Sequence, residues 1–232
     1  MKQDEFKGDK KLPIISLTGS LERQLIEATI HKIPRWIEGY HLTLMTIIWS
    51  AGLIFFGYLA QGNRHWLWCS SLMVFLQWFT DSYDGALGRL RGTGIPKWGY
   101  YMDHFLDYVF LCAVFIGYSF LLQQENLRGL FILLTIFTAF MMNSYLSFAA
   151  TNEFKITFLG CGPTEIRILF ILVNTSLIFF GPRFIEQPIQ YVIPVALIAL
   201  GIVVFRTQQY IWNIDMADKR ASSEKREKTE GK

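Results

Sequence analysis

Long apolar runs without charge set the pattern of this 232-residue chain. Residues 42–60 and 129–151 contain no Asp, Glu, Lys or Arg. Each run is longer than the roughly 18 residues that mark a membrane-spanning helix. The chain is 52% hydrophobic, with a mean hydropathy of +0.28. We therefore expect an all-α integral membrane protein.

Polar residues interrupt three of the apolar segments. The second segment is free of charge only up to Asp81. The third segment is free of charge only beyond Asp107, and the fifth only beyond Arg167. The remaining apolar parts, roughly 15 residues each, are too short alone for a hydrocarbon core of about 30 Å. We expect these helices to continue through the polar residues, which then face one another instead of lipid. The pattern predicts six transmembrane helices, at about 42–61, 66–88, 100–122, 128–151, 164–181 and 188–211.

The segments outside these spans are polar or amphipathic. Between Ser20 and Ile33, apolar residues recur at helical spacing with charges between them, and Pro34 ends the pattern. This predicts an amphipathic helix, either on the membrane surface or packed on the bundle as a cap. Residues after about Asp218 form a charged tail that we expect to lack stable structure. The predicted organisation is an N-terminal segment 1–38, a six-span domain 39–212 and a tail 213–232.

Positive charge predicts which side of the membrane each end occupies. With six spans, both termini lie on one side, together with Arg89, Arg91 and Lys97. The connections on the other side carry only Arg64, Arg128 and Arg183. The side rich in Lys and Arg is cytoplasmic by the positive-inside rule.

Four aspartates fall at the charged ends of the second and third spans. Asp81 and Asp84 are three residues apart, and Asp103 and Asp107 are four apart, so each pair shares a helix face. The short connection predicts antiparallel neighbouring helices whose carboxylates converge. Carboxylates at membrane depth are costly, and hard oxygen ligands favour Mg²⁺ or Mn²⁺, as one or two ions.

Small residues and an arginine accompany the aspartates. Gly85 and Gly88 remove side chains one turn apart, which allows a ligand to approach the backbone. Arg89 offers a fork suited to a phosphate. Metal, phosphate partner and bare backbone together indicate a nucleotide diphosphate.

These residues resemble the signature of the CDP-alcohol phosphotransferases, D-x2-D-G-x2-A-R-x8-9-G-x3-D-x3-D. Gly88 stands where that family has alanine. The resemblance covers essentially the whole chain and implies transfer of a substituted phosphate from a CDP-linked donor to an alcohol, with release of CMP. It also implies that the first three aspartates hold metal and pyrophosphate, while the fourth completes the metal site or acts as a base. The matching positions are Asp81, Asp84, Gly85, Arg89, Gly99, Asp103 and Asp107.

Two shorter matches resemble the choline/ethanolamine phosphotransferase branch. They are Asp103-His104 and the sequence Gly162-Pro163-Thr164-Glu165. The resemblance implies that His104 and Glu165 deprotonate a lipid hydroxyl. The alternatives are an interfacial histidine and an acid that begins a helix. Arg167 has two interpretations: its side chain reaches lipid headgroups, or it contacts a phosphate or a carboxylate.

Three other functions stay open. The same fold serves CDP-diacylglycerol as donor and a polar alcohol such as glycerol phosphate, inositol or serine as acceptor, for which Arg167 and Lys155 would supply a cationic pocket. Intramembrane prenyltransferases bind Mg²⁺-diphosphate through aspartate motifs, but their two motifs normally lie far apart. A cation transporter would need a second buried charge cluster. We expect the protein to interact with a lipid bilayer and with its two substrates, and not with nucleic acid. The sequence leaves open whether it forms a homodimer.

Overall fold

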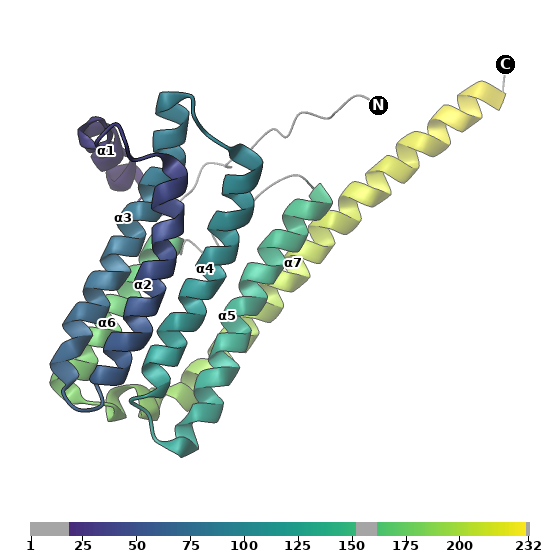
Figure 1. Ribbon diagram of the computed structural model, residues 1–232. Helices are drawn as coiled ribbons and strands as arrows, with labels where there is room; N and C mark the ends of the chain where they lie inside the picture. Colours follow the sequence, from purple (N-terminus) through teal and green to yellow (C-terminus); the bar gives the residue numbers. More distant parts are fainter. Residues whose placement is uncertain (1–18, 152–161, 231–232) are drawn as a thin grey trace.

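The computed structural model describes residues 19–151 and 162–230, with side chains to residue 223. Every regular element in these ranges is helical, which confirms the expected all-α class. Helices α2 to α7 run alternately in opposite directions (Figure 1). The elements are α1 (Gly19–Thr29), η1 (Ile30–Lys32), α2 (Gly39–Leu59), η2 (Arg64–Trp66), α3 (Leu67–Arg91), α4 (Pro96–Ser119), α5 (Gln124–Thr151), α6 (Pro163–Phe180) and α7 (Arg183–Glu230).

Four helices are long and apolar enough to cross a membrane: α2, α5, α6 and the Arg183–Ser223 part of α7. Large apolar side chains on their outer faces are exposed, including Phe55, Leu146 and Ile198, as expected for contact with lipid. Helices α3 and α4 have 25 and 24 residues, so each is roughly 36 Å long. Their polar and charged residues make them less apolar than these four helices, and their membrane crossing stays a prediction.

Helix α2 is the element on which α3 and α4 pack. A Cβ added at Gly57 would lie 2.6 Å from Cα of Gly117 on α4, and one at Gly39 would lie 2.6 Å from the carbonyl oxygen of Asp84 on α3. Glycines thus allow α2 to approach both helices.

Within the described residues, α3 and α4 each lie closer to α2 than to one another. Side chains join α3 to α4 where Gln77 donates a hydrogen bond of 3.3 Å to Asp107. The expectation of neighbouring helices whose carboxylates converge holds for Asp81 of α3 and for Asp103 and Asp107 of α4.

The N-terminal helical segment lies at the same end of the bundle as the connection from α3 to α4 (Figure 1). Ile30 is buried in a small apolar cluster with Leu42 and Tyr83, whereas Leu21 and Leu25 of α1 are exposed. Its C-terminal part therefore caps the bundle and its N-terminal part presents an apolar face outward. That this face lies on a membrane stays a prediction.

Polar contacts join α1 to two other helices. The Glu22 carboxylate accepts hydrogen bonds from Ser82 on α3, at 2.7 Å, and from Thr164 on α6, at 2.8 Å. Both hydroxyls neighbour predicted site residues in the sequence, since Ser82 follows Asp81 and Thr164 precedes Glu165. Helix α1 is thereby fixed to the two segments that carry those residues.

Helix α7 does not end near residue 211 but continues to Glu230, beyond the rest of the bundle (Figure 1). The expectation of an unstructured tail after Asp218 is wrong over this range. Methionine, alanine, lysine and arginine dominate residues 216–221. Because these residues have high helix propensity, the helix extends without tertiary support.

Candidate active site

Three of the four predicted carboxylates meet in the structure. Asp81 comes from α3, and Asp103 and Asp107 come from successive turns of α4. One carboxylate oxygen from each residue lies within 4.8 Å of the others. All three residues are partly buried. We call this group the carboxylate cluster.

Arg167 joins the carboxylate cluster from a third helix, α6. Its Nη2 lies 2.9 Å from Oδ2 of Asp81 and 3.2 Å from Oδ1 of Asp107. The residue is only 6% exposed, so the two ion pairs are well removed from solvent. The contact is with carboxylates, which is one of the partners predicted for this arginine.

Gln77 holds the same arginine in place and was not predicted as a site residue. Its Oε1 accepts a hydrogen bond of 2.6 Å from Nε of Arg167, and its Nε2 donates one of 3.3 Å to Oδ1 of Asp107. The side chain is fully buried. Its position four residues before Asp81, on the same face of α3, is the sequence signal that could have indicated it.

Asp84 lies outside the group formed by the other three aspartates. Its Oδ2 accepts a hydrogen bond of 2.5 Å from the buried hydroxyl of Thr43 on α2, and its Oδ1 accepts one from the backbone N–H of Gly85. The contact across α2 and α3 depends on the close approach at Gly39. Thr43 is a second site residue that sequence reasoning missed.

The glycines near the cluster have different surroundings. A Cβ at Gly99 would meet nothing within 4 Å, and one at Gly85 would lie 3.3 Å from the Arg89 guanidinium. Gly85 and Arg89 are exposed. Gly88 is buried, and its Cβ would lie 3.1 Å from Cα of Gly94 in the connection to α4. Gly88 therefore shapes that connection, whereas Gly85 and Gly99 leave backbone accessible.

His104 contacts the carboxylate cluster, whereas Glu165 makes a contact at the start of its own helix. Nδ1 of His104 is 3.5 Å from Oδ2 of Asp103, and its ring lies against Tyr100 with centroids 4.2 Å apart. Glu165, in the first turn of α6, accepts a hydrogen bond of 2.8 Å from the backbone N–H of Gly162. This carboxylate thus caps its own helix. Lys155 lies outside the described residues.

The carboxylate cluster fits a small divalent cation. Mg²⁺ binds oxygen at 2.0–2.1 Å in an octahedron, so opposite ligands stand about 4.2 Å apart. The oxygens of Asp81, Asp103 and Asp107 are within 4.8 Å of one another, so a small side-chain adjustment brings them onto one ion. Three carboxylates are the hard donors that such an ion prefers.

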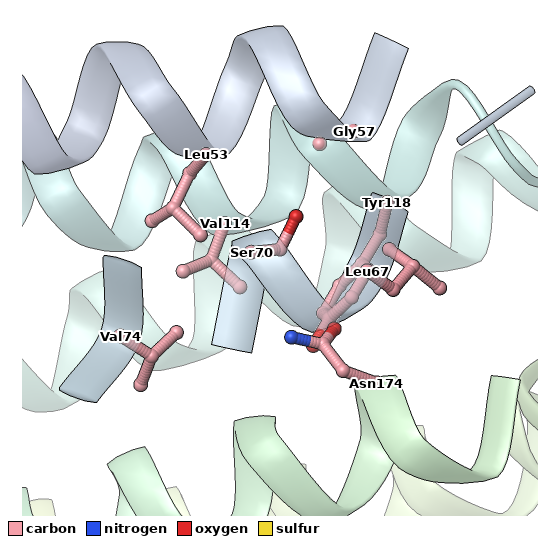
Figure 2. A pocket seen from close by; sticks show the side chains of 9 residues that line it. Leu53, Gly57, Leu67, Ser70, Val74, Val114, Tyr118 and Asn174 are labelled. Carbon is pink, nitrogen blue, oxygen red and sulfur yellow. The ribbon is translucent and has the colours of Figure 1, made fainter. Parts of the chain in front are cut away.

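A small cavity elsewhere in the bundle has a different lining (Figure 2). Its polar side chains are Ser70, Tyr118 and Asn174, and it contains no carboxylate. The other residues around it are apolar or glycine. The cavity therefore belongs to helix packing and not to the candidate site.

Residues 39–206 match the model of the CDP-alcohol phosphatidyltransferase family. The match begins at the first residue of α2 and includes the carboxylate cluster, Gln77 and Arg167. No curated protein sequence matches the chain significantly.

Proposed function

Because the chain belongs to the CDP-alcohol phosphatidyltransferase family, we propose that it transfers a substituted phosphate from a CDP-choline or CDP-ethanolamine type donor to diacylglycerol. The transfer releases CMP. The observation that carries the proposal is the carboxylate cluster, in which Asp81, Asp103 and Asp107 bring three oxygens within 4.8 Å. Family membership also argues against the prenyltransferase and transporter alternatives.

In this proposal, separate residues bind the cation and the nucleotide. Asp81, Asp103 and Asp107 hold Mg²⁺ or Mn²⁺, with Asp84 as a further ligand if it leaves Thr43. When bound, the cation supplies positive charge against the diphosphate and the departing CMP. The accessible backbone at Gly85 and Gly99 and the exposed Arg89 bind the CDP portion.

The transfer itself is a displacement at phosphorus. The acceptor hydroxyl oxygen forms a bond to the phosphorus that carries the alcohol group of the donor. The bond from that phosphorus to the bridging oxygen breaks, and CMP leaves with the bonding electrons. The hydroxyl proton passes to a carboxylate of the protein, because an alcohol is a weak nucleophile until it is deprotonated.

We assign the base role to Glu165, assisted by His104. Oδ1 of Asp107 already receives hydrogen bonds from Arg167 and Gln77, which favours a ligand role for that carboxylate over proton transfer. Glu165 is the remaining acid in the first turn of α6. His104 is in contact with the cluster through Asp103.

The surroundings of Arg167 favour diacylglycerol over a phosphorylated polar acceptor. A phosphorylated acceptor needs a cationic pocket, and Arg167 was one of two residues suited to it. Its guanidinium pairs with Asp81 and Asp107 instead. A neutral lipid hydroxyl requires no such cation.

We further propose that α2 to α7 form six membrane spans with the site on the cytoplasmic side. Basic residues gather near the α3–α4 connection, at Arg89, Arg91 and Lys97. Helix α1 and the C-terminal part of α7 lie at the same end (Figure 1). At the opposite end, the basic residues in or next to the connections between described helices are Arg64, Arg128 and Arg183. The positive-inside rule supports this orientation.

The donor assignment is tested with purified protein, Mg²⁺ and defined substrate pairs, with CMP as the readout. One arm contains CDP-choline or CDP-ethanolamine with diacylglycerol. The other contains CDP-diacylglycerol with glycerol phosphate, inositol or serine. We expect CMP in the first arm only, and CMP in the second arm only would reverse the donor and acceptor.

The base assignment is tested by Glu165→Gln in the productive arm. We expect kcat to fall roughly 10²- to 10⁴-fold, the usual contribution of a positioned base, with donor binding unchanged. Wild-type kcat in this variant would return the base role to Asp107.

A further inference from the structure

We propose that Arg167 is the internal counter-ion of the carboxylate cluster, which stabilises the cation-free protein and lowers the affinity of the cluster for a divalent cation. The inference rests on the metal role in the proposed function and concerns how tightly the ion is held. Arg167 acts through Asp81 and Asp107 and is a positioning residue, since the carboxylates are the groups that meet the ion.

The charges in the cluster require a partner when no cation is bound. Three carboxylates lie within 4.8 Å of one another, and Arg167 contacts two of them through a single nitrogen, Nη2. Like charges at this spacing repel strongly away from water, and an opposite charge between them relieves that repulsion. The formal charge of the four groups is minus two, which one divalent cation neutralises.

The hydrogen bonds of the guanidinium fix it in this position. Gln77 accepts from Nε of Arg167 and donates to Asp107, so the amide links the arginine to one of its own carboxylates. Both Gln77 and Arg167 are buried. A planar guanidinium with several donors is suited to such a bridge, and a lysine ammonium would keep the charge but lose the linked geometry.

A fixed positive charge beside the ligands has opposite effects on the two states of the site. It stabilises the cation-free cluster, and it repels an incoming divalent cation. Removing the charge should therefore destabilise the cation-free protein more than the cation-bound one. By linkage, a ligand that binds the folded state more tightly raises its stability further.

The experiment is thermal unfolding without substrate, followed by tryptophan fluorescence in detergent. Wild-type protein, Arg167→Gln and Arg167→Lys are compared in chelator and in saturating Mn²⁺. Arg64→Gln is the matched control, because Arg64 contacts the carbonyl of Leu177 and lies in η2, which precedes α3 at the end of that helix away from Asp81. Titration calorimetry of Mn²⁺ gives the dissociation constant for each protein.

We expect Arg167→Gln to unfold at a lower temperature than wild type in chelator and to recover most of that loss in Mn²⁺. Its rise in Tm with Mn²⁺ should exceed the wild-type rise, with a dissociation constant lower by on the order of tenfold. Arg167→Lys should lie nearer to wild type. Arg64→Gln should lower Tm equally in both conditions.

A variant that is unstable without metal still decides the question. If Arg167→Gln can be purified only in Mn²⁺, unfolding on chelation supports the proposal, and aggregation despite saturating Mn²⁺ contradicts it. A rise in Tm equal to or smaller than that of wild type overturns the counter-ion role alone. A wild-type protein without any Mn²⁺ response overturns the metal site itself.

Discussion

Helices α3 and α6 are joined at two levels by contacts of different kinds. At the level of the active site, Asp81 and Gln77 of α3 contact Arg167 of α6 through an ion pair and a hydrogen bond. Ten residues earlier on α3, Ser71 accepts a neutral hydrogen bond of 3.1 Å from Asn174. Gln77, Arg167, Ser71 and Asn174 are all buried, and Asp81 is partly buried.

The neutral contact is what helix association in a membrane ordinarily uses. Hydrogen bonds of this kind contribute about 0.6 kcal/mol on average and cost little to bury. The charged contact is expensive, because each ion must leave water or lipid headgroups. Since Ser71 and Asn174 show that a neutral pair can join these helices, the charges at Asp81 and Arg167 serve a purpose other than packing.

The largest difference between the two contacts should appear in activity. Asp107→Asn removes a carboxylate from the cluster and leaves its shape nearly unchanged. We expect CMP release to fall about 10³-fold or more, as for residues that act as one catalytic unit. The assay is CMP release in the productive substrate arm at saturating Mg²⁺, with thermal unfolding as the check on folding. Near-normal turnover would separate the reaction from the cluster.

A smaller effect is expected at the residue that supports the cluster without belonging to it. Gln77→Leu removes the two hydrogen bonds by which the amide bridges Arg167 and Asp107, and it leaves their direct contact in place. Changes in residues that orient a metal ligand typically cost 10- to 100-fold in activity, and we expect a loss of that size in kcat/KM. If Gln77→Leu retains wild-type kcat/KM, the amide is only a packing residue like Asn174.

The smallest effect is expected at the neutral contact. Ser71→Ala leaves the amide of Asn174 without its partner on α3 and should lower the free energy of unfolding by about 1 kcal/mol. CMP release should stay at the wild-type value. Thermal unfolding and the CMP assay on the same preparation measure both quantities. A loss of turnover comparable to that of Gln77→Leu would remove the distinction between the two contacts.

The sequence predicted the positions of the helices along the chain more reliably than it predicted which helices pack on one another. Uncharged runs and the aspartate spacing led to six helical segments, and all six are helices in the structure. The short connection between α3 and α4 predicted that their carboxylates converge, but not that α2 would lie closer to each of them than they lie to one another. Glycines on α2 decide that arrangement, and pairing of small residues between distant helices is not visible in a single sequence.

The sequence predicted the carboxylates of the candidate site, but not the residues that hold those carboxylates in place. Asp81, Asp103 and Asp107 converge as expected, because spacing of three or four residues fixes a helix face. Thr43 and Gln77 resemble any other polar residue in a membrane helix until their partners are known. The contact of Arg167 with two aspartates from different helices likewise requires the tertiary structure.

The most direct test of the central claim is Mn²⁺ binding followed by electron paramagnetic resonance, without substrate, in wild type, Asp81→Asn and Ser71→Ala. We predict that wild type and Ser71→Ala bind Mn²⁺ with the same affinity, and that Asp81→Asn binds it at least about tenfold more weakly. Equal affinity in all three proteins would place the cation away from the carboxylate cluster and contradict the proposed site.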